Sequence, residues 1–284
     1  MSTKIRFWGV RGSIASPGAE TAGVGGNTSC VEIMAGKTRL ICDAGTGMRG
    51  LGQAMVAEGP GEVTLLLSHL HWDHIQGLPF FLPAYVPGNR IAVVGRRTAE
   101  MGVGDALEHQ MRAPVFPVRF GELAADVGFH HVVPGQAMHV GDAVVRCAAG
   151  NHPGGVLAYR IEHEGRVVVY ATDTEHYSCI DPALLELARG ADVLIYDAQY
   201  TPEEYAGAVG RSKVGWGHST WEAATQLAER AGVRELVLFH HDPQRTDEGV
   251  AAIERMAQMR FRDTVSAREG LTLTLAGVEE SRAA

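Results

Sequence analysis

Four side chains that can bind a metal ion, His69, His71, Asp73 and His74, lie within six residues of one another. The apolar run 63–67 precedes them and predicts a buried strand, which places the cluster on the turn at that strand's carboxyl end. Imidazole nitrogen and carboxylate oxygen are the ligands that zinc and similar divalent ions prefer. In irregular backbone, the first two histidines can face one ion while Asp73 and His74 face a second. A solvated, histidine-rich turn is the alternative, but so many ligands behind one buried strand argue against it.

Four other predicted strands deliver an Asp or a His in the same way. These residues are Asp43 after 39–42, His152 after 144–148, Asp173 after 167–170 and His240 after 236–239. Loops that a rigid sheet positions are where binding and catalytic groups usually lie. One such histidine alone would more often be structural. Several of them behind buried strands predict a single site at the edge of a sheet.

A histidine outside these strand ends is the candidate acid. Residues 219–222 have the sequence Ser-Thr-Trp-Glu, a capping box that predicts Ser219 as the N-cap of a helix over 223–231. His218 precedes this N-cap, where free backbone N–H groups favour an anion, so it could bind a phosphoryl oxygen or protonate a leaving alkoxide. A role in the capping turn is the alternative. His176 and His241 are weaker candidates that could support a metal ligand or face substrate.

The other elements predict a mixed α/β protein with layered sheets. Strands are expected at 4–8, 30–34, 39–42, 63–67, 91–94, 144–148, 156–161, 167–170, 193–196, 236–239 and 271–275, with a tight hairpin turn at 163–165. Helices are expected at 183–189, capped by Asp181, at 223–231, and from Thr246 or Asp247 to about 260. No linker divides the chain, so we expect one domain over 3–277 and a C-terminal tail at 278–284.

Composition sets limits on location and partners. Hydrophobic content of 45% and charged content of 20% are typical of a soluble globular protein. The formal net charge of −8, without a basic run, argues against a dedicated nucleic-acid surface but permits a small phosphate ester. No apolar run approaches the ~18 residues of a membrane span and no signal-peptide core is present, so we expect a cytoplasmic protein without membrane contact. Cys30, Cys42 and Cys147 lie in apolar segments and are expected to be buried and reduced.

The ordered pattern His69-x-His71-x-Asp73-His74, followed by His152, Asp173 and His240, is similar to the signature of the metallo-β-lactamase superfamily. The resemblance covers essentially the whole chain and implies a four-layer αββα sandwich with two metal ions at one edge of the paired sheets. It assigns His69, His71 and His152 to the first ion. It assigns Asp73, His74 and His240 to the second ion, with Asp173 bridging the two. Asp43 matches an Asp that supports a ligand histidine in this superfamily.

One branch of the superfamily resembles the chain more than the others. The Gly-His-Ser-Thr sequence at 217–220 is similar to the His-Ser-Thr loop of ribonuclease Z and related phosphodiesterases, and segments 9–13 and 25–29 also resemble that branch. Bacterial ribonuclease Z carries a long tRNA-binding arm between the motifs that correspond to His152 and Asp173. Only twenty residues separate the two here, and most of them predict a hairpin. Pre-tRNA processing is therefore disfavoured, and the family resemblance makes a homodimer a reasonable expectation.

The leading hypothesis is a dinuclear metal-dependent hydrolase that cleaves a small phosphodiester such as a cyclic nucleotide. A hydroxide held between two ions ~3.5–4 Å apart would be the nucleophile. Asp73, besides its ligand role, could orient the attacking water, and His218 could act as the acid. The nitrogen-rich ligands favour zinc, with manganese or iron as alternatives. Two other functions stay open: an acyl hydrolase acting on a lactone, thioester or β-lactam, and a non-catalytic sensor or binding module.

Overall fold

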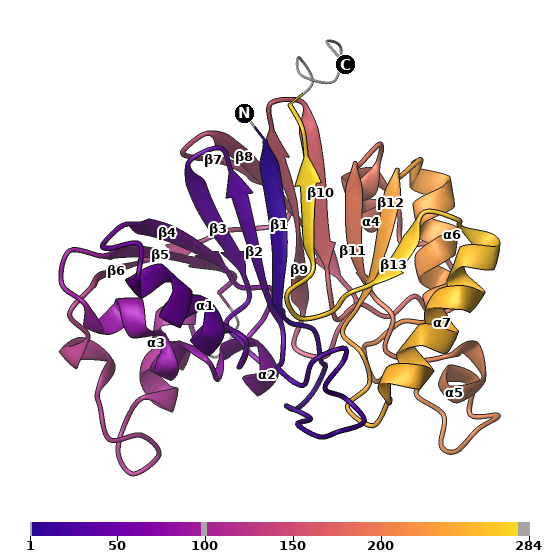
Figure 1. Ribbon diagram of the computed structural model, residues 1–284, viewed down its shortest axis with the longest axis horizontal. Coiled ribbons are helices and arrows are strands. Elements are labelled where there is room, and N and C mark those ends of the chain that lie inside the picture. Colours follow the sequence, from indigo (N-terminus) through magenta and orange to yellow (C-terminus); the bar gives the residue numbers. More distant parts are fainter. Residues whose placement is uncertain (1, 98–100, 278–284) are drawn as a thin grey trace.

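Two seven-stranded sheets face each other in the computed structural model, which describes residues 2–97 and 101–277 (Figure 1). In spatial order the first sheet contains β14 (Thr272–Leu275), β1 (Thr3–Gly9), β2 (Cys30–Ala35), β3 (Thr38–Cys42), β4 (Glu62–Leu66), β5 (Arg90–Gly95) and β6 (Asp126–His131). The second contains β13 (Thr264–Ser266), β12 (Glu235–Phe239), β11 (Val193–Asp197), β10 (Arg166–Ala171), β9 (Val156–His163), β8 (Ala143–Gly150) and β7 (Ala137–Val140). The predicted tail at 278–284 lies outside the described residues.

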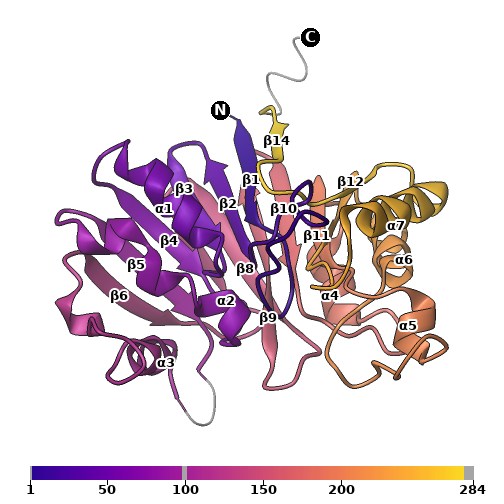
Figure 2. The ribbon, with the colours of Figure 1, turned by 60° about the horizontal axis from the view of Figure 1, so that its bottom comes forward.

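Helices flank both sheets (Figures 1 and 2). Beside the first sheet lie α1 (Met48–Val56), α2 (Trp72–Ile75) and α3 (Val103–Gln110), with the 3₁₀ turns η1 (Leu78–Phe80), η2 (Leu82–Tyr85) and η3 (Phe120–Glu122). Beside the second lie α4 (Pro182–Ala188), α5 (Pro202–Ala206), α6 (Trp221–Ala231) and α7 (Asp247–Arg260). One apolar cluster fills the space between the sheets. A second lies between the second sheet and its helices, and a third lies between the first sheet and its helices. This layer order confirms the predicted αββα sandwich.

Parallel strands decide where the candidate residues lie. β3 to β6 are parallel neighbours in the first sheet, and β10 to β13 are parallel neighbours in the second. Carboxyl ends of parallel neighbours share one edge of a sheet, so the segments after β3, β4, β10, β11 and β12 leave along common edges. The two edges meet, because His74 after β4 lies 3.3 Å from Asp173 after β10. In Figure 1 α2 marks this region at the bottom centre of the molecule.

The structure confirms each strand predicted from the apolar runs, within one or two residues at the ends. The hairpin is also confirmed, because Glu164 and Gly165 both have positive φ between the paired residues His163 and Arg166. The predicted N-cap of α6 is wrong by one residue: Thr220 is the N-cap, and its hydroxyl accepts from the backbone N–H of Ala223. Both hydroxyl residues can cap a helix, so the sequence alone does not choose between them.

Several elements escaped sequence analysis because their patterns are weak. β6 and β7 lie at sheet edges with alternating exposed and half-buried residues, and β13 has only three residues. The helices α1, α2 and α3 are short and begin without a side-chain cap. α5 has only five residues, but the capping box of Thr201 and Glu204 could have revealed its start. None of the helices in the described ranges is long and apolar enough to cross a bilayer. The three cysteines expected in the interior are buried.

Candidate metal centre

Residues from both sheets converge at the shared edge into three groups of possible metal-binding atoms. Two of them contain the expected ligands: His69, His71 and His152, and Asp73, His74, Asp173 and His240. The third adds Asp197 and His218 to Asp173 and His240 of the second group. Within each group, one donor atom from every residue lies within 4.8 Å of the donor atoms of the others. Every residue expected as a metal ligand from the sequence is therefore placed in one of two adjoining clusters.

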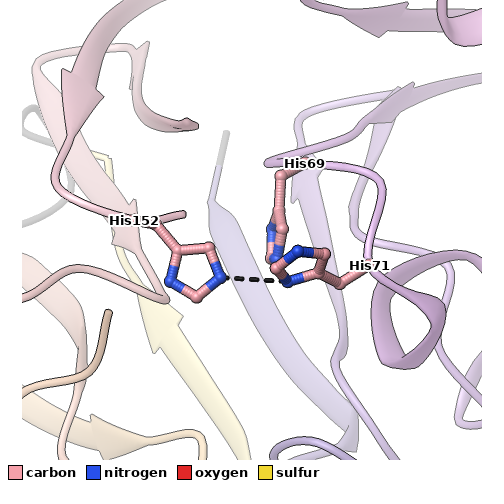
Figure 3. Close-up of side chains that lie close together, drawn as sticks. All are labelled: His69, His71 and His152. Atoms are coloured by element: carbon pink, nitrogen blue, oxygen red, sulfur yellow. Dashed lines mark hydrogen bonds between the residues drawn. The ribbon is translucent and has the colours of Figure 1, made fainter. Parts of the chain in front are cut away.

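The first group combines the turn after β4 with the end of β8 (Figure 3). His69 is buried, His152 is partly buried and His71 is exposed. His71 Nδ1 lies 3.0 Å from His152 Nε2. The ring centroid of His69 lies 4.5 Å from that of His71 and 4.7 Å from that of His152. Three imidazoles this close together match the nitrogen donors of a divalent ion.

Asp173 lies between the two groups and turns one oxygen towards each. Its Oδ2 lies 3.6 Å from His69 Nε2 and 3.8 Å from His152 Nε2. Its Oδ1 lies 3.3 Å from His74 Nε2 and 3.1 Å from His240 Nε2. A single carboxylate thus faces both sets of imidazole nitrogens, and its side chain is only 2% exposed.

Asp43 orients two of the histidines, one directly and one through a serine. His74 Nδ1 donates to Asp43 Oδ2 at 2.7 Å, and the Tyr170 hydroxyl donates to the same oxygen at 2.7 Å. Ser68 Oγ also donates to this oxygen, at 2.8 Å, and lies 3.0 Å from His69 Nδ1, from which it can accept. These bonds fix the tautomers of His74 and His69 so that each Nε2 lone pair faces the centre. The position matches the supporting role that the resemblance implies for Asp43.

Two other histidines are oriented by groups that sequence analysis missed. His152 Nδ1 donates to the carbonyl of Gly217 at 2.8 Å, and His240 Nδ1 donates to Gln199 Oε1 at 2.9 Å. Glu175 holds Gly217 in place, because its carboxylate accepts from the Gly217 backbone N–H at 2.8 Å. No sequence signal marks Gln199, whereas Glu175, two residues beyond Asp173, lies within a segment already singled out.

The electrostatics of the site favour a cation. Burial, reinforced by His74, lowers the pKa of His69, which keeps that ring neutral. Burial alone would raise the pKa of Asp73, but His74 and His240 outweigh it and hold the carboxylate ionised. The pKa of Asp173 is likewise lowered, because His240 and His74 outweigh the effect of its burial. Burial opposes protonation of His74, but Asp73, Asp173 and Asp43 outweigh it and raise the pKa of that ring. A metal ion bound there would take the place of this proton, because metal binding requires neutral imidazoles beside ionised carboxylates.

Two buried nitrogens support a fit to metal. Among the described residues, His69 Nε2 and His74 Nε2 have no hydrogen-bond partner of acceptable geometry. A buried polar atom without a partner costs ~1–3 kcal/mol, so native proteins rarely leave one unexplained. A metal ion bound to these atoms removes that cost. The residues present therefore fit the divalent ions that the fold implies.

Strained backbone occurs at three of these strand ends. Asp43, Asp173 and His240 have φ values of 62°, 50° and 59°. Residues other than glycine are uncommon in this left-handed region, which costs ~1–3 kcal/mol at a strained position. Each residue follows a buried strand, and the turn directs its side chain to the centre. Strain that recurs at three contributors to one cluster points to a functional constraint.

His218 also reaches the centre, but it is held by a partner that sequence analysis overlooked. Its Nδ1 donates to Asp197 Oδ2 at 2.9 Å, and its ring stacks on His240 with centroids 5.0 Å apart. Burial opposes protonation, but Asp197 outweighs it and raises the pKa of His218 to about 9. Asp197 ends β11, so the reasoning applied to the other strand ends could have found it. Because the N-cap is Thr220, His218 lies two residues before the cap rather than one.

His176 and His241 occupy different surroundings from the centre. His176 Nδ1 lies 3.0 Å from Ser219 Oγ, and its ring packs on Tyr205 with centroids 4.5 Å apart. His241 is buried, and its Nε2 donates to the carbonyl of Ala267 at 2.9 Å. Burial lowers the pKa of His241 to about 3, which keeps the ring neutral. Neither histidine lines the cavity beside the two clusters.

An open cavity of about 450 Å³ adjoins the two clusters. Its walls are formed by Ser13, Leu70, His71, Trp72, Asp73, Asp173 and His218. The volume lies in the ~300–1,000 Å³ range of small-molecule sites. Donor atoms from both groups and the candidate acid therefore face a space that a small substrate can enter.

Comparisons with known proteins agree with this architecture. A profile of the Beta-lactamase superfamily domain matches residues 38–241. The ribonuclease Z of Mycobacterium sp. (strain KMS) is 30% identical over 237 residues, which cover 74% of this chain and 76% of that protein. The ribonuclease Z of Brevibacillus brevis is 44% identical over 84 residues, and this match covers 30% of this chain but only 24% of that protein. The metallo-beta-lactamase fold protein YhfI from Bacillus subtilis aligns over 96% of this chain and 99% of its own, with a TM-score of 0.69 at 20% identity.

The chain therefore belongs to the family of Beta-lactamase superfamily domains, as the ordered His and Asp pattern predicted. It is a hydrolase of the metallo-β-lactamase fold, with ribonuclease Z among its relatives. Its His and Asp clusters suit divalent metal ions.

Proposed function

We propose that this chain is a dinuclear, zinc-dependent phosphodiesterase that acts on small phosphodiesters such as cyclic nucleotides. Its candidate ligands are His69, His71 and His152 for the first ion, Asp73, His74 and His240 for the second, and Asp173 for both. Five imidazoles among seven ligands favour zinc over the harder ions that prefer oxygen.

The position of Asp173 carries this proposal. One of its oxygens faces His69 and His152, and the other faces His74 and His240. A carboxylate that only balanced the charge of one histidine would not need both oxygens turned to opposite imidazole groups. This arrangement suits a bridge between two cations.

The chain's own residues can position and protonate the reacting groups. Bound divalent ions would lower the pKa of a coordinated water and withdraw charge from phosphoryl oxygens. The backbone N–H of Ser13 donates to Asp73 Oδ2 at 2.8 Å, which fixes this carboxylate on the cavity wall, where it can orient an attacking water. His218 uses Nδ1 to donate to Asp197, so Nε2 is the ring nitrogen left to protonate a leaving alkoxide.

Three observations favour a phosphodiester of small size. A relative that is 30% identical over most of its length is named ribonuclease Z, and ribonucleases act on phosphodiesters. The span between His152 and Asp173 is taken up by the hairpin of β9 and β10, which leaves no segment for an inserted RNA-binding arm. The net charge of −8 also disfavours a long polyanion.

The experiment that tests the proposal combines metal analysis with a substrate panel. Protein purified after growth with zinc, manganese and iron is analysed for its metal content, and it is expected to retain two zinc ions per chain. Asp173→Asn should lose metal, because it removes the charge shared by both groups. Turnover of bis(p-nitrophenyl) phosphate is compared with that of p-nitrophenyl acetate. Cleavage of the acyl ester alone would contradict the phosphodiesterase, and failure to retain any divalent ion would contradict the metal centre.

A further inference from the structure

Trp72 lies between two residues of the centre, yet its side chain faces water. It is 79% exposed, while its neighbour Asp73 is 5% exposed, and both residues line the cavity. Ile14 is also 61% exposed, and it follows Ser13, whose backbone N–H donates to Asp73. An exposed indole at the mouth of a polar site presents apolar area that folding did not cover. Such a surface in a cavity wall is typical of a ligand contact.

The local structure holds this indole outwards. Trp72 begins α2, and the three residues after it, Asp73, His74 and Ile75, are 5%, 0% and 4% exposed. Successive helix residues point about 100° apart, so three buried neighbours leave only the solvent side for the first position. The candidate metal ligands on either side fix the backbone. The orientation of Trp72 is thus a consequence of the same turn that builds the centre.

Two of the other three tryptophans of the chain already have partners for their rings. The guanidinium of Arg6 lies 4.1 Å from the ring centroid of Trp8, and the Lys213 ammonium lies 4.1 Å from that of Trp216. Within residues 2–97 and 101–277, no cation or aromatic ring stacks on Trp72. Its faces are available to a flat group that enters the cavity.

We propose that Trp72 is a stacking platform for an aromatic group on the substrate, so that the substrate class is a phosphodiester that carries a nucleobase. The inference rests on the proposed function and narrows it from phosphodiesters in general to nucleotide diesters. Stacking on an indole is tolerant of base identity, because every base presents a π-face. Trp72 therefore contributes to affinity for the base, while the centre binds the phosphate.

The test measures binding rather than turnover, on the full zinc-loaded chain. Adenosine monophosphate and ribose 5-phosphate share a sugar and a phosphate and differ in the base, and calorimetry gives a Kd for each. Wild-type protein should bind adenosine monophosphate more tightly. Trp72→Ala should weaken that binding about tenfold and change the affinity for ribose 5-phosphate by about twofold at most. Trp72→Phe should restore most of the difference between the two Kd values. Trp216→Ala, the control at another exposed tryptophan, should keep the wild-type ratio of the two Kd values.

Equal affinity of the wild-type protein for the two ligands would overturn the inference, as would no measurable binding of either. An equal loss for both ligands in Trp72→Ala would also overturn it. Turnover of bis(p-nitrophenyl) phosphate is measured in parallel and separates this inference from the proposed function. A base preference that depends on Trp72, without turnover, would support stacking and contradict the phosphodiesterase. Turnover without base preference would contradict stacking alone.

Discussion

Replacing Asp43 by Asn tests whether buried hydrogen bonds set the metal affinity of the centre. The left-handed backbone at this position tolerates Asn, so the change acts on the side chain alone. The amide can keep one oxygen for the backbone N–H of Ser68, but its NH₂ group then faces His74 Nδ1. Two donors cannot pair, so His74 is expected to move its proton to Nε2, the nitrogen that faces the centre. Support of this kind is typically worth ~10–100-fold in metal affinity.

That loss corresponds to ~1.4–2.8 kcal/mol at ~1.4 kcal/mol for each tenfold change. Competition with a chromogenic chelator measures zinc affinity, and the weaker site should be the one that contains His74. Tyr170→Phe is the matched control, since it removes a hydrogen bond to the same oxygen without affecting a tautomer. It should cost ~1 kcal/mol of unfolding free energy in urea and leave zinc affinity nearly unchanged. Unchanged zinc affinity in Asp43→Asn would refute the tautomer argument.

Three further predictions follow from contacts at and near the centre. His218 is protonated below its pKa of about 9, so phosphodiester turnover should fall as pH rises through about 9. Asp197→Asn should move this limb of the kcat profile to lower pH, because it removes the largest contribution that raises the pKa of His218, and an unchanged profile would contradict the acid role. His218→Ala should lower kcat by ~10²–10⁴-fold with metal retained. Zinc that binds only the folded chain should stabilise it by ~2.7 kcal/mol at a free zinc concentration of 100 Kd. Chelation by EDTA should therefore lower the Tm. A Tm that neither zinc nor EDTA changes would contradict metal binding that is coupled to folding. Thr220→Ala should cost ~1 kcal/mol of unfolding free energy by removing the N-cap of α6, while a smaller loss than in Ser219→Ala would restore Ser219 as the cap.

Strand ends were the part of the site that sequence could locate. An apolar run followed by a His or Asp fixes where a polar group leaves a sheet, and parallel pairing brings such groups together. His69, Asp173 and His240, far apart in sequence, could therefore be grouped in advance. The αββα order was implied by the resemblance of the ordered motif to a known superfamily, whereas the predicted strands and helices by themselves indicated only a mixed α/β protein with layered sheets.

Supporting contacts were less accessible to sequence analysis, since they depend on distances between segments remote in the chain. Gln199 is an ordinary amide until the fold places its oxygen 2.9 Å from His240 Nδ1. Glu175 acts through the backbone of Gly217, forty-two residues away, which no local pattern encodes. β6 was missed for another reason: an edge strand exposed on one face does not need an apolar sequence.

The left-handed turns at Asp43, Asp173 and His240 direct side chains to the centre but lower the stability of the fold, so activity and heat resistance place opposite demands on these three positions. Glycine would adopt the same φ without penalty, so His240→Gly should relax the backbone while it deletes a proposed ligand. Where zinc is scarce and no bound ion offsets the strain, directed evolution that rewards survival at high temperature alone would favour loss of the centre at these positions first. Selection for a more robust variant needs an activity screen in every round, and Asn is the safer replacement when the two aspartates are probed, because it accepts the unusual conformation.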